Sequence, residues 1–531
     1  MSFFAEPPWN PASPEWLALD RQLATDHAVR QIARLTDEEL DLQALRRTYS
    51  GRGSRPHRPD LLLKLVLYEH DQGRPQPVQW FKDLQENTAV AWLVFGMKPS
   101  QTVLYEFRDR VGPLLRQWNQ QVIRTAIAEG HTDGTRGALD GTTVAANASR
   151  HRLLSLETVE KRLERLEQEL ARAEPAPEPT AALGLPAPAE PLAPDPAASG
   201  PLASPGHEPA PPSFLGKTVH GQKRQRARYR RAREILRQRH RANRRRRKDK
   251  QKKAARIVLA IGDPAAPLGL DKLGTYRPLY NVQTMSDVGT DLVLAYATVP
   301  TTTDSGQLVP MIDRTHQVTQ RRLNEVLVDS GYPSGQELAQ CAERGVTVLA
   351  PWNENAWTAA KRAQAGADDQ IPKDQFTFDP SIPGYRCPEG AVLRYRARTS
   401  KQKANGDYVP LEVYQADPSD CGCCPLQARC VRSGSGARSV RRQEHEELIE
   451  AMTERMNTPE GKQKYRERGC TVERRFADFK THRGLQRFSG QTPERADAQV
   501  GLTVLAHNLQ TLAKLRIRAE QHEQNPEKTA S

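Results

Sequence analysis

Long apolar runs are missing from this sequence of 531 residues. The most apolar stretch, LLLKLVLY at 61–68, is short and contains Lys64, so no segment is predicted to span a membrane. The first residues, MSFFAEPPWNP, lack the basic start and the apolar run of a secretion signal. We therefore expect a cytoplasmic, nucleoid-associated protein with no membrane partner.

Cysteines are few, and most of them are clustered. Five of the seven lie between 387 and 430, and in a reducing compartment such clustering favours metal binding over disulfides. Cys421 and Cys424 have the Cys-x-x-Cys spacing with which two thiolates hold one Zn²⁺, and Cys387 and Cys430 would complete a structural site. The alternative is a small domain that packs reduced cysteines.

Positive charge is concentrated in a single segment. The formal net charge is +14, and residues 217–256 contain 20 Lys or Arg and two acids, a net of 20 − 2 = +18, which leaves 14 − 18 = −4 for the rest. Such a segment repels itself, and its natural partner is a polyanion. We expect a helix over 217–253 that contacts DNA; the alternatives are a disordered solubilising tract and a nuclear-type address. The expected DNA contacts include Arg244, Arg245, Arg246 and Arg247.

The chain divides into a helical part and a mixed part. Residues 1–125 predict a helical N-terminal DNA-binding domain, in which Thr36 and Glu39 have the spacing of a capping box. A helical bundle that serves only as a structural cap is the alternative. Strands are then predicted at 136–146, 279–286, 291–299, 324–329 and 346–350, with helices from about Ser305 and Ser334 and a last helix around Glu473. This order indicates an α/β fold with a ribonuclease H-like catalytic core, assembled from 136–150, 257–352 and 451–516.

Two insertions interrupt the core. The first, 151–256, combines a short helix, a Pro/Ala-rich linker at 172–216 and the basic segment. Its 13 prolines between Pro175 and Pro212 predict a lack of regular structure. The second, 353–450, contains the cysteines and predicts two strands around Asn405-Gly406, which would return the chain from Cys387 to Cys421. Residues 517–531 are expected to be a disordered tail.

Three acids stand at points of this order that converge in a ribonuclease H-like core. Asp140 lies on the first strand, Asp329 at the exit of the fourth, and Glu473 on the last helix. Taken singly, they predict a turn, a helix cap and a surface acid. Converging carboxylates repel one another unless cations neutralise them, and hard oxygen ligands favour Mg²⁺ or Mn²⁺. Two such ions can promote phosphodiester cleavage.

Several sequence blocks resemble those of bacterial insertion-sequence transposases of the DDE class. ALDGTTVAANAS is similar to their first-Asp motif, LYNVQT and VDSGYPSGQELAQCAERGV to their second-strand and second-Asp blocks, and YRERGCTVERRFADFKTHRGLQRF to their Tyr-Arg-Glu-Lys block. RGSRPHRPDLLLKLVLYEHDQGRPQPVQWFKDL and TVLYEFRDRV resemble their N-terminal domain. The resemblance covers most of the chain, with its blocks in the family's order.

The resemblance implies that Tyr465, Arg468 and Lys480 contact transposon-end DNA. The family's block has two, three and six residues in its successive gaps, whereas four residues separate Arg468 from Glu473 here. The implied function is metal-dependent cleavage at transposon ends and strand transfer into target DNA by a homo-oligomer. Two alternatives are an inactive or domesticated DNA-binding relative and a host nuclease that cuts without joining.

Overall fold

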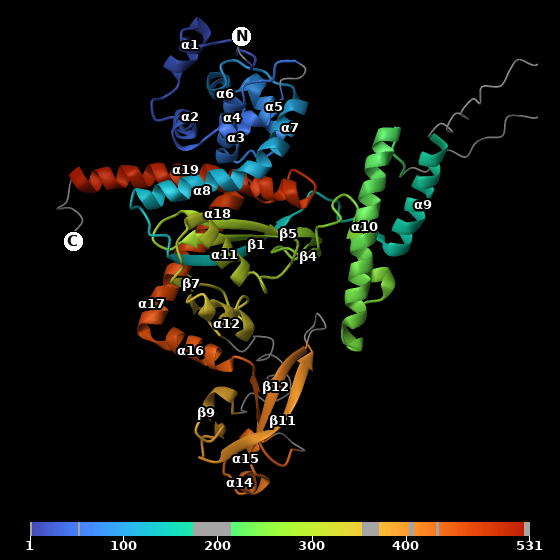
Figure 1. The fold of residues 1–531 in the computed structure, drawn as a ribbon, viewed down its shortest axis with the longest axis vertical. Helices are drawn as coiled ribbons and strands as arrows, with labels where there is room; N and C mark the ends of the chain where they lie inside the picture. Colours follow the sequence, from blue (N-terminus) through green and yellow to red (C-terminus); the bar gives the residue numbers. More distant parts are fainter. Residues whose placement is uncertain are drawn as a thin grey trace, which may run out of the picture.

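The computed structural model describes residues 3–50, 54–173, 214–352, 371–402, 408–431 and 435–524. The N-terminal helices form a cap over two long helices, which in turn cover a mixed sheet (Figure 1). A two-helix hairpin stands beside this core, and a smaller sheet lies at the end of the molecule opposite the N-terminal helices (Figure 1). Within the described ranges, no helix is both long enough and apolar enough to cross a membrane.

The predicted helical N-terminal region is confirmed as eight α-helices and one 3₁₀ turn. These are α1 Pro14–Gln22, α2 Ala28–Glu39, α3 Gln43–Arg47, α4 Pro59–Asp71, α5 Pro77–Glu86, α6 Thr88–Leu93, α7 Gln101–Val111, η1 Gly112–Leu114 and α8 Leu115–Ala128. The predicted capping box is wrong, because Thr36 lies inside α2 and its hydroxyl donates to the Ile32 carbonyl at 2.7 Å. The buried stripe of Val29, Ile32 and Leu35 draws this segment into α2.

The central sheet has the predicted order of strands and helices. Its strands are β1 Arg136–Ala145, β4 Leu268–Leu270, β5 Tyr276–Asp287, β6 Val293–Val299, β7 Glu325–Leu327 and β8 Thr347–Leu349. The strand order is β4-β5-β1-β7-β8, and β6 also pairs with β5. β5 is antiparallel to β1, whereas β7 and β8 follow β1 in parallel. Two helices join the later strands, α11 Leu308–Thr319 and α12 Gly335–Glu343, and the predicted Ser334 caps α12 by accepting from the Glu337 amide at 3.3 Å.

Residues alternate between the two faces of β1. Leu139 joins the core that the N-terminal helices and α11 share, and Ala138 and Val144 point to the other face. Val472 packs against Ala138, and Phe476 packs in the cluster of Val144. The covering segment consists of α16 Glu446–Asn457, α17 Pro459–Arg468, the π-helical turn η5 Gly469–Glu473 and α18 Arg474–Thr481.

The last helix, α19 Pro493–Gln524, lies between the N-terminal helices and the sheet (Figure 1). Its residues between Ala496 and Ala513 are buried on nearly every side, as expected of a helix enclosed by two layers. The predicted disordered tail over 517–531 is therefore wrong up to Gln524, because α19 continues through it. Residues 525–531 lie outside the described residues.

The first insertion forms a helical hairpin. Its elements are β2 Leu153–Ser155, α9 Leu156–Ala173, α10 Val219–Arg245, η2 Lys248–Lys250, η3 Ala254–Arg256 and β3 Val258–Ala260. Antiparallel pairing of β2 with β3 closes its base. Val159 and Leu163 of α9 pack in one cluster with Tyr229 and Leu236 of α10. The helix predicted over 217–253 is confirmed over α10 and is wrong beyond Arg245, where the chain continues through the short turn η2. The predicted irregular linker lies outside the described residues between 174 and 213.

The second insertion contains a five-stranded antiparallel sheet with the order β13-β12-β11-β10-β9. Its elements are η4 Lys373–Gln375, β9 Thr377–Asp379, β10 Gly384–Arg386, β11 Val392–Gln402, β12 Tyr408–Gln415, α14 Pro418–Gly422, α15 Gln427–Cys430 and β13 Ser439–Gln443. Pairing of β11 with β12 confirms the two predicted strands. Their turn at Asn405-Gly406 lies outside the described residues.

Candidate active site and cysteine cluster

Asp140 lies in the middle of β1, opposite Thr284 of β5, and not in a turn. Its side chain is 22% exposed, and Arg468 Nη2 lies 2.9 Å from Asp140 Oδ1. Burial raises the pKa of Asp140, Arg468 opposes this shift, and the carboxylates of Asp304 and Asp329 add to it. Two other acids are therefore close enough to disfavour the charge on Asp140.

Asp329 is aligned with Asp140 by the parallel pairing of β7 with β1. The register pairs Ala138 with Leu327; Asp140 lies two residues further along β1, and Asp329 lies two residues beyond Leu327, the last residue of β7. Asp329 is exposed, and its Oδ1 accepts from the Ser330 amide at 2.5 Å and the Ser330 hydroxyl at 3.1 Å. The two predicted aspartates thus lie close to each other, one within β1 and the other just past the end of the neighbouring strand β7.

Glu473 is the exposed last residue of the π-helical turn η5. Residues four apart lie on the same side of an α-helix, and a π turn needs one more residue to complete the same rotation. Arg468 immediately precedes η5, and Glu473, five residues later, ends it. The π turn therefore accommodates the additional residue between them. Glu473 therefore keeps the orientation relative to Arg468 that an α-helix with a three-residue gap would give.

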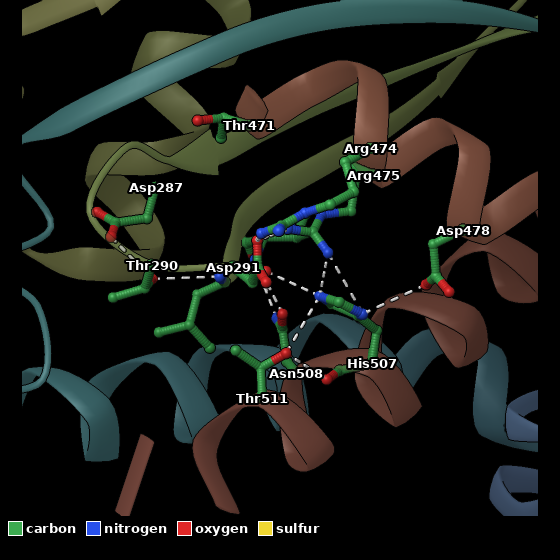
Figure 2. A network of polar contacts seen from close by, with 12 residues as sticks. Asp287, Thr290, Asp291, Thr471, Arg474, Arg475, Asp478, His507, Asn508 and Thr511 are labelled. Carbon is green, nitrogen blue, oxygen red and sulfur yellow. Dashed lines mark hydrogen bonds and ion pairs between the residues drawn. The ribbon is translucent and has the colours of Figure 1, made fainter. Parts of the chain in front are cut away.

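A partly buried polar network holds the helix that begins immediately after Glu473 (Figure 2). Asp291, in the turn between β5 and β6, accepts from Arg474 at 2.6 Å and from Arg475 at 3.1 Å. Arg475 also contacts His507 of α19, and burial together with this cation lowers the pKa of His507 to about 4. The network ties α18 to the sheet and α19, and so fixes the position of Glu473.

Three hydroxyl groups surround Asp140 on its own face of the sheet. Thr142 follows it on β1, Thr284 is its partner on β5, and Ser286 is two residues further along β5. All three residues are buried, and their hydroxyls make no hydrogen bond with the described residues. Buried hydroxyls normally have a hydrogen-bond partner, so these three hydroxyls are available to hydrogen-bond water or a hydrated ligand beside Asp140.

The donor chemistry beside Asp140 fits a hydrated divalent cation. Asp140 and Asp329 supply hard carboxylate oxygens, and their mutual repulsion is what a cation would relieve. Unpartnered hydroxyls next to Asp140 suit the water that such an ion retains. In the described part of the chain, however, no three His, Cys, Asp or Glu side chains are gathered as a metal site. The predicted meeting of three carboxylates is therefore not present as a formed site.

A fourth acid, Asp304, lies behind Gly141 on the opposite face of β1 and was not predicted. Its Oδ1 accepts from Asn281 at 2.8 Å and from Gln283 at 2.7 Å. The Tyr332 hydroxyl donates to Gln283 at 2.5 Å. Two polar residues at alternate positions of an apolar strand are the sequence signal for such a network, and Asn281 and Gln283 have that spacing.

We expect Gly141→Ala to disturb this network. A Cβ at Gly141 would overlap with Asp304 Oδ1 and Gln283 Nε2, so both side chains would have to move and lose hydrogen bonds. The expected cost is about 1–3 kcal/mol of unfolding free energy, measured by thermal and chemical denaturation. Gly289→Ala is the control, because its Cβ would meet only Asp287 Oδ2 at 3.7 Å. Equal stability of the two variants would contradict this account of Gly141.

Two of the three residues expected to contact transposon-end DNA lie near Asp140. Arg468 pairs with it, and Tyr465 lies close enough to Arg468, Asp329 and Asp140 for each to influence its pKa, which burial raises. Lys480 is turned towards β1, where its Nζ donates to the Thr143 carbonyl at 3.2 Å. Burial lowers the pKa of Lys480. Tyr465 and Arg468 thus share the site, and Lys480 is held at the adjoining stretch of β1.

The four arginines predicted to contact DNA cluster at the end of α10. Arg244 and Arg245 end the helix, and Arg246 and Arg247 follow it. The Arg245 carbonyl accepts from Gln402 of the second insertion at 3.1 Å. These arginines belong to the hairpin that stands beside the core (Figure 1), and form a group separate from Tyr465 and Arg468.

Three of the five clustered cysteines, Cys387, Cys421 and Cys430, pack in one small core, and Cys424 lies near Cys430. Cys421 and Cys430 are buried, Cys387 and Cys424 are partly buried, and Cys423 is exposed. Burial raises the pKa of Cys430, and the thiols of Cys421, Cys387 and Cys424 raise it further. These four are the predicted zinc ligands, and Cys423 points to its own helix, with Sγ 3.5 Å from the Ser419 carbonyl. They are neighbours, but the described residues contain no formed metal site.

Comparison with known proteins gives two family matches. A model described as "Transposase domain (DUF772)" matches residues 17–110, over the N-terminal helices. A model described as "Transposase DDE domain" matches residues 386–513, from the second insertion through Glu473 into α19. No curated protein and no solved structure matches the chain. With a transposase model matched at the N-terminal helices and another across the segment of Glu473, the two matches support an insertion-sequence transposase of the DDE class.

Proposed function

We propose that this transposase cleaves phosphodiester bonds at transposon ends and transfers the freed 3′-hydroxyl end into target DNA. The observation that carries the proposal is the closeness of Asp140, on β1, to Asp329, which follows the adjacent parallel strand β7, with Arg468 beside Asp140. The central sheet and its covering helices, on this proposal, are a ribonuclease H-like catalytic core. The substrate is DNA, and joining two ends requires a homo-oligomer assembled on it.

We assign Asp140, Asp329 and Glu473 as the ligands of Mg²⁺ or Mn²⁺. When bound, such ions activate the attacking oxygen and stabilise the leaving oxygen. Arg468 balances the charge of Asp140 in the free protein and, with Tyr465, provides donors for a scissile phosphate. The hydroxyls of Thr142, Thr284 and Ser286 would hold water beside Asp140.

A strand-transfer assay tests this function. Purified protein is incubated with labelled DNA containing the element's terminal sequences, a supercoiled target plasmid and MgCl₂. We expect nicked end DNA first and joined end–target products later. Cut product without joined product would indicate a nuclease, the alternative that the sequence left open.

A DNA-binding protein without catalysis is the second candidate. The ion pair of Arg468 with Asp140 favours it, because this contact occupies a proposed metal-ligand carboxylate. Retained DNA binding with neither cut nor joined product in Mg²⁺ or Mn²⁺ would support this candidate over the transposase reaction.

We also propose a structural zinc ion bound by Cys387, Cys421, Cys424 and Cys430. Metal analysis of the purified protein should give about one zinc per chain, since four thiolates complete a tetrahedral site. The double variant Cys421→Ser/Cys424→Ser should lose it and unfold the second insertion at lower temperature, because zinc binding and folding are coupled in such sites.

Cys423→Ser is the matched control, and should keep the zinc because Cys423 is exposed and turned to its own helix. If protein purified from zinc-replete cells contains none, the four cysteines are merely reduced thiols in a small core.

A further inference from the structure

A cavity of about 680 Å³ opens where β1 ends, and its lining is cationic. It is bounded by the chain that follows β1, the start of β5, the turn before α19 and one residue of α10. No acidic residue lines it. Its charged side chains are Arg150, Arg152, Arg228, Arg277 and Arg487, with His151 beside them.

Backbone and side-chain hydrogen bonds fix the walls of this cavity. The Ala145 amide donates to the Gln486 carbonyl at 3.3 Å, and the Phe488 amide donates to the Ala145 carbonyl at 2.9 Å. Asn147 Nδ2 donates to the Ser489 carbonyl at 2.7 Å. The end of β1 and the turn before α19 are therefore joined into one rigid rim, so the arginines are presented on a preformed surface.

Three arginines of α10 form ion pairs with acids, but the one that lines the cavity does not. Arg230 pairs with Glu167 at 2.6 Å, and Arg237 pairs with Glu160 at 2.7 Å. Arg228 has no ion pair with the described residues, and the same holds for three other arginines of the lining: Arg150, Arg152 and Arg487. Arg277 is the exception, with Asp271 at 3.0 Å. Four exposed arginines thus converge without a counter-charge, which is the pattern of a polyanion site.

We propose that this cavity binds successive backbone phosphates of the DNA strand that leads to Asp140. Ala145, on the rim, is five residues along β1 from Asp140, or about 17 Å at the rise of an extended strand. Duplex DNA advances about 3.4 Å per nucleotide along its axis, so the bound phosphates lie about five steps from the reacting bond. This inference rests on the proposed function only in its claim that the bound DNA strand leads from the cavity to Asp140.

The proposal also gives the first insertion a place in the DNA-binding surface. Arg228 brings α10 to a cavity whose other walls belong to the central sheet and the turn before α19. The hairpin therefore contributes directly to a site on the core, and its basic helix continues that site away from β1. The cavity's arginines come from four segments of the chain, so a single inorganic phosphate could contact only a few of them. A DNA strand presents several phosphates at once.

Salt-dependent DNA binding by the full chain tests the proposal. The probe is a fluorescent 30-base-pair duplex, and a 30-nucleotide oligo(dT) is run in parallel. For Arg152→Gln/Arg487→Gln we expect about tenfold weaker binding, and a slope of log affinity against log salt that is lower by about two, one for each lost phosphate contact. Cleavage should need more DNA for half-maximal rate, with kcat unchanged.

Arg344→Gln/Arg386→Gln is the matched control. It removes the same charge from arginines outside the cavity, which pair with Asp313 and Asp379, and its salt slope should remain that of the parent. An unchanged slope for the cavity variant, or a slope lowered equally in both variants, would overturn the proposal. So would loss of inorganic-phosphate binding with no change in DNA affinity.

Failure of this inference is distinguishable from failure of the proposed function. The binding assay needs no catalysis, so a protein that never cuts DNA can still show the altered slope. Conversely, if the cavity variant cleaved and joined DNA normally and its salt slope were unaltered, the cavity would not be a DNA-binding site, and the proposed transposase reaction would be unaffected.

Discussion

Asp140→Asn and Asp329→Asn should each reduce DNA cleavage by about 10³-fold or more. Each change replaces a proposed metal-ligand carboxylate by a neutral amide, and a loss of about 4 kcal/mol in transition-state stabilisation corresponds to that factor. Folding should survive in Asp140→Asn, because its amide oxygen still accepts from Arg468 and because burial and Asp304 already disfavour the charge at this position. Single-turnover cleavage measured at saturating DNA gives the direct reading.

Two measurements separate catalysis from structure in this experiment. DNA affinity and the thermal unfolding midpoint should stay close to those of the parent. Asp313→Asn, an acid of α11 that pairs with Arg344, is the matched control and should cleave normally. If Asp140→Asn cleaved DNA at the parental rate, the assignment of Asp140 as a metal ligand would be wrong.

The order of the core could be predicted because buried strands leave apolar runs in the sequence. The predicted strands around Asp140 and Asp329 correspond to β1 and to β7 with its exit. The ribonuclease H-like order of strands and helices then predicted that Asp140 and Asp329 lie at the same end of the sheet. What the pattern could not supply is the register, and it is the pairing of Ala138 with Leu327 that brings the two carboxylates level.

Residues outside the strands were harder to place. Asp304 lies in the chain between β6 and α11, and only the absence of a side chain at Gly141 lets it approach β1. No periodicity marks such a position, since it depends on packing between segments far apart in the sequence. The cavity arginines pose the same difficulty, because Arg152, Arg228 and Arg487 meet only in the folded chain.

Helix ends show how tertiary packing overrides local signals. Thr36 has the spacing of a cap, but burying Ile32 and Leu35 stabilises a helix that runs through it. Burial of a single Leu or Ile contributes about 1.5–3 kcal/mol, more than a cap of about 1 kcal/mol. The end of α19 was placed too early for a different reason: residues 517–524 are exposed, so no buried stripe marks their continuation of the helix.

The π turn that ends at Glu473 contains one residue more than an α-helical turn, and a single deletion would remove it. Deleting the exposed Cys470 should convert η5 into an ordinary α-helical turn, because a π turn contains one residue more than an α turn. The buried side chains of α18, Arg475, Phe476 and Phe479, would still point into the core. We expect the deletion variant to fold, with DNA cleavage within about threefold of the parent, a change of under ~1 kcal/mol.

Inserting one alanine after Cys470 should have the opposite effect. The π turn already holds the one residue that it can absorb, so a second would rotate everything that follows by about 100°. The Arg474 and Arg475 contacts with Asp291 would then be lost together with the position of Glu473. We expect cleavage to fall at least 100-fold and the unfolding midpoint to drop by several degrees. If the deletion variant were as inactive as the insertion variant, the π turn itself would be required, and its role would not be to absorb an additional residue.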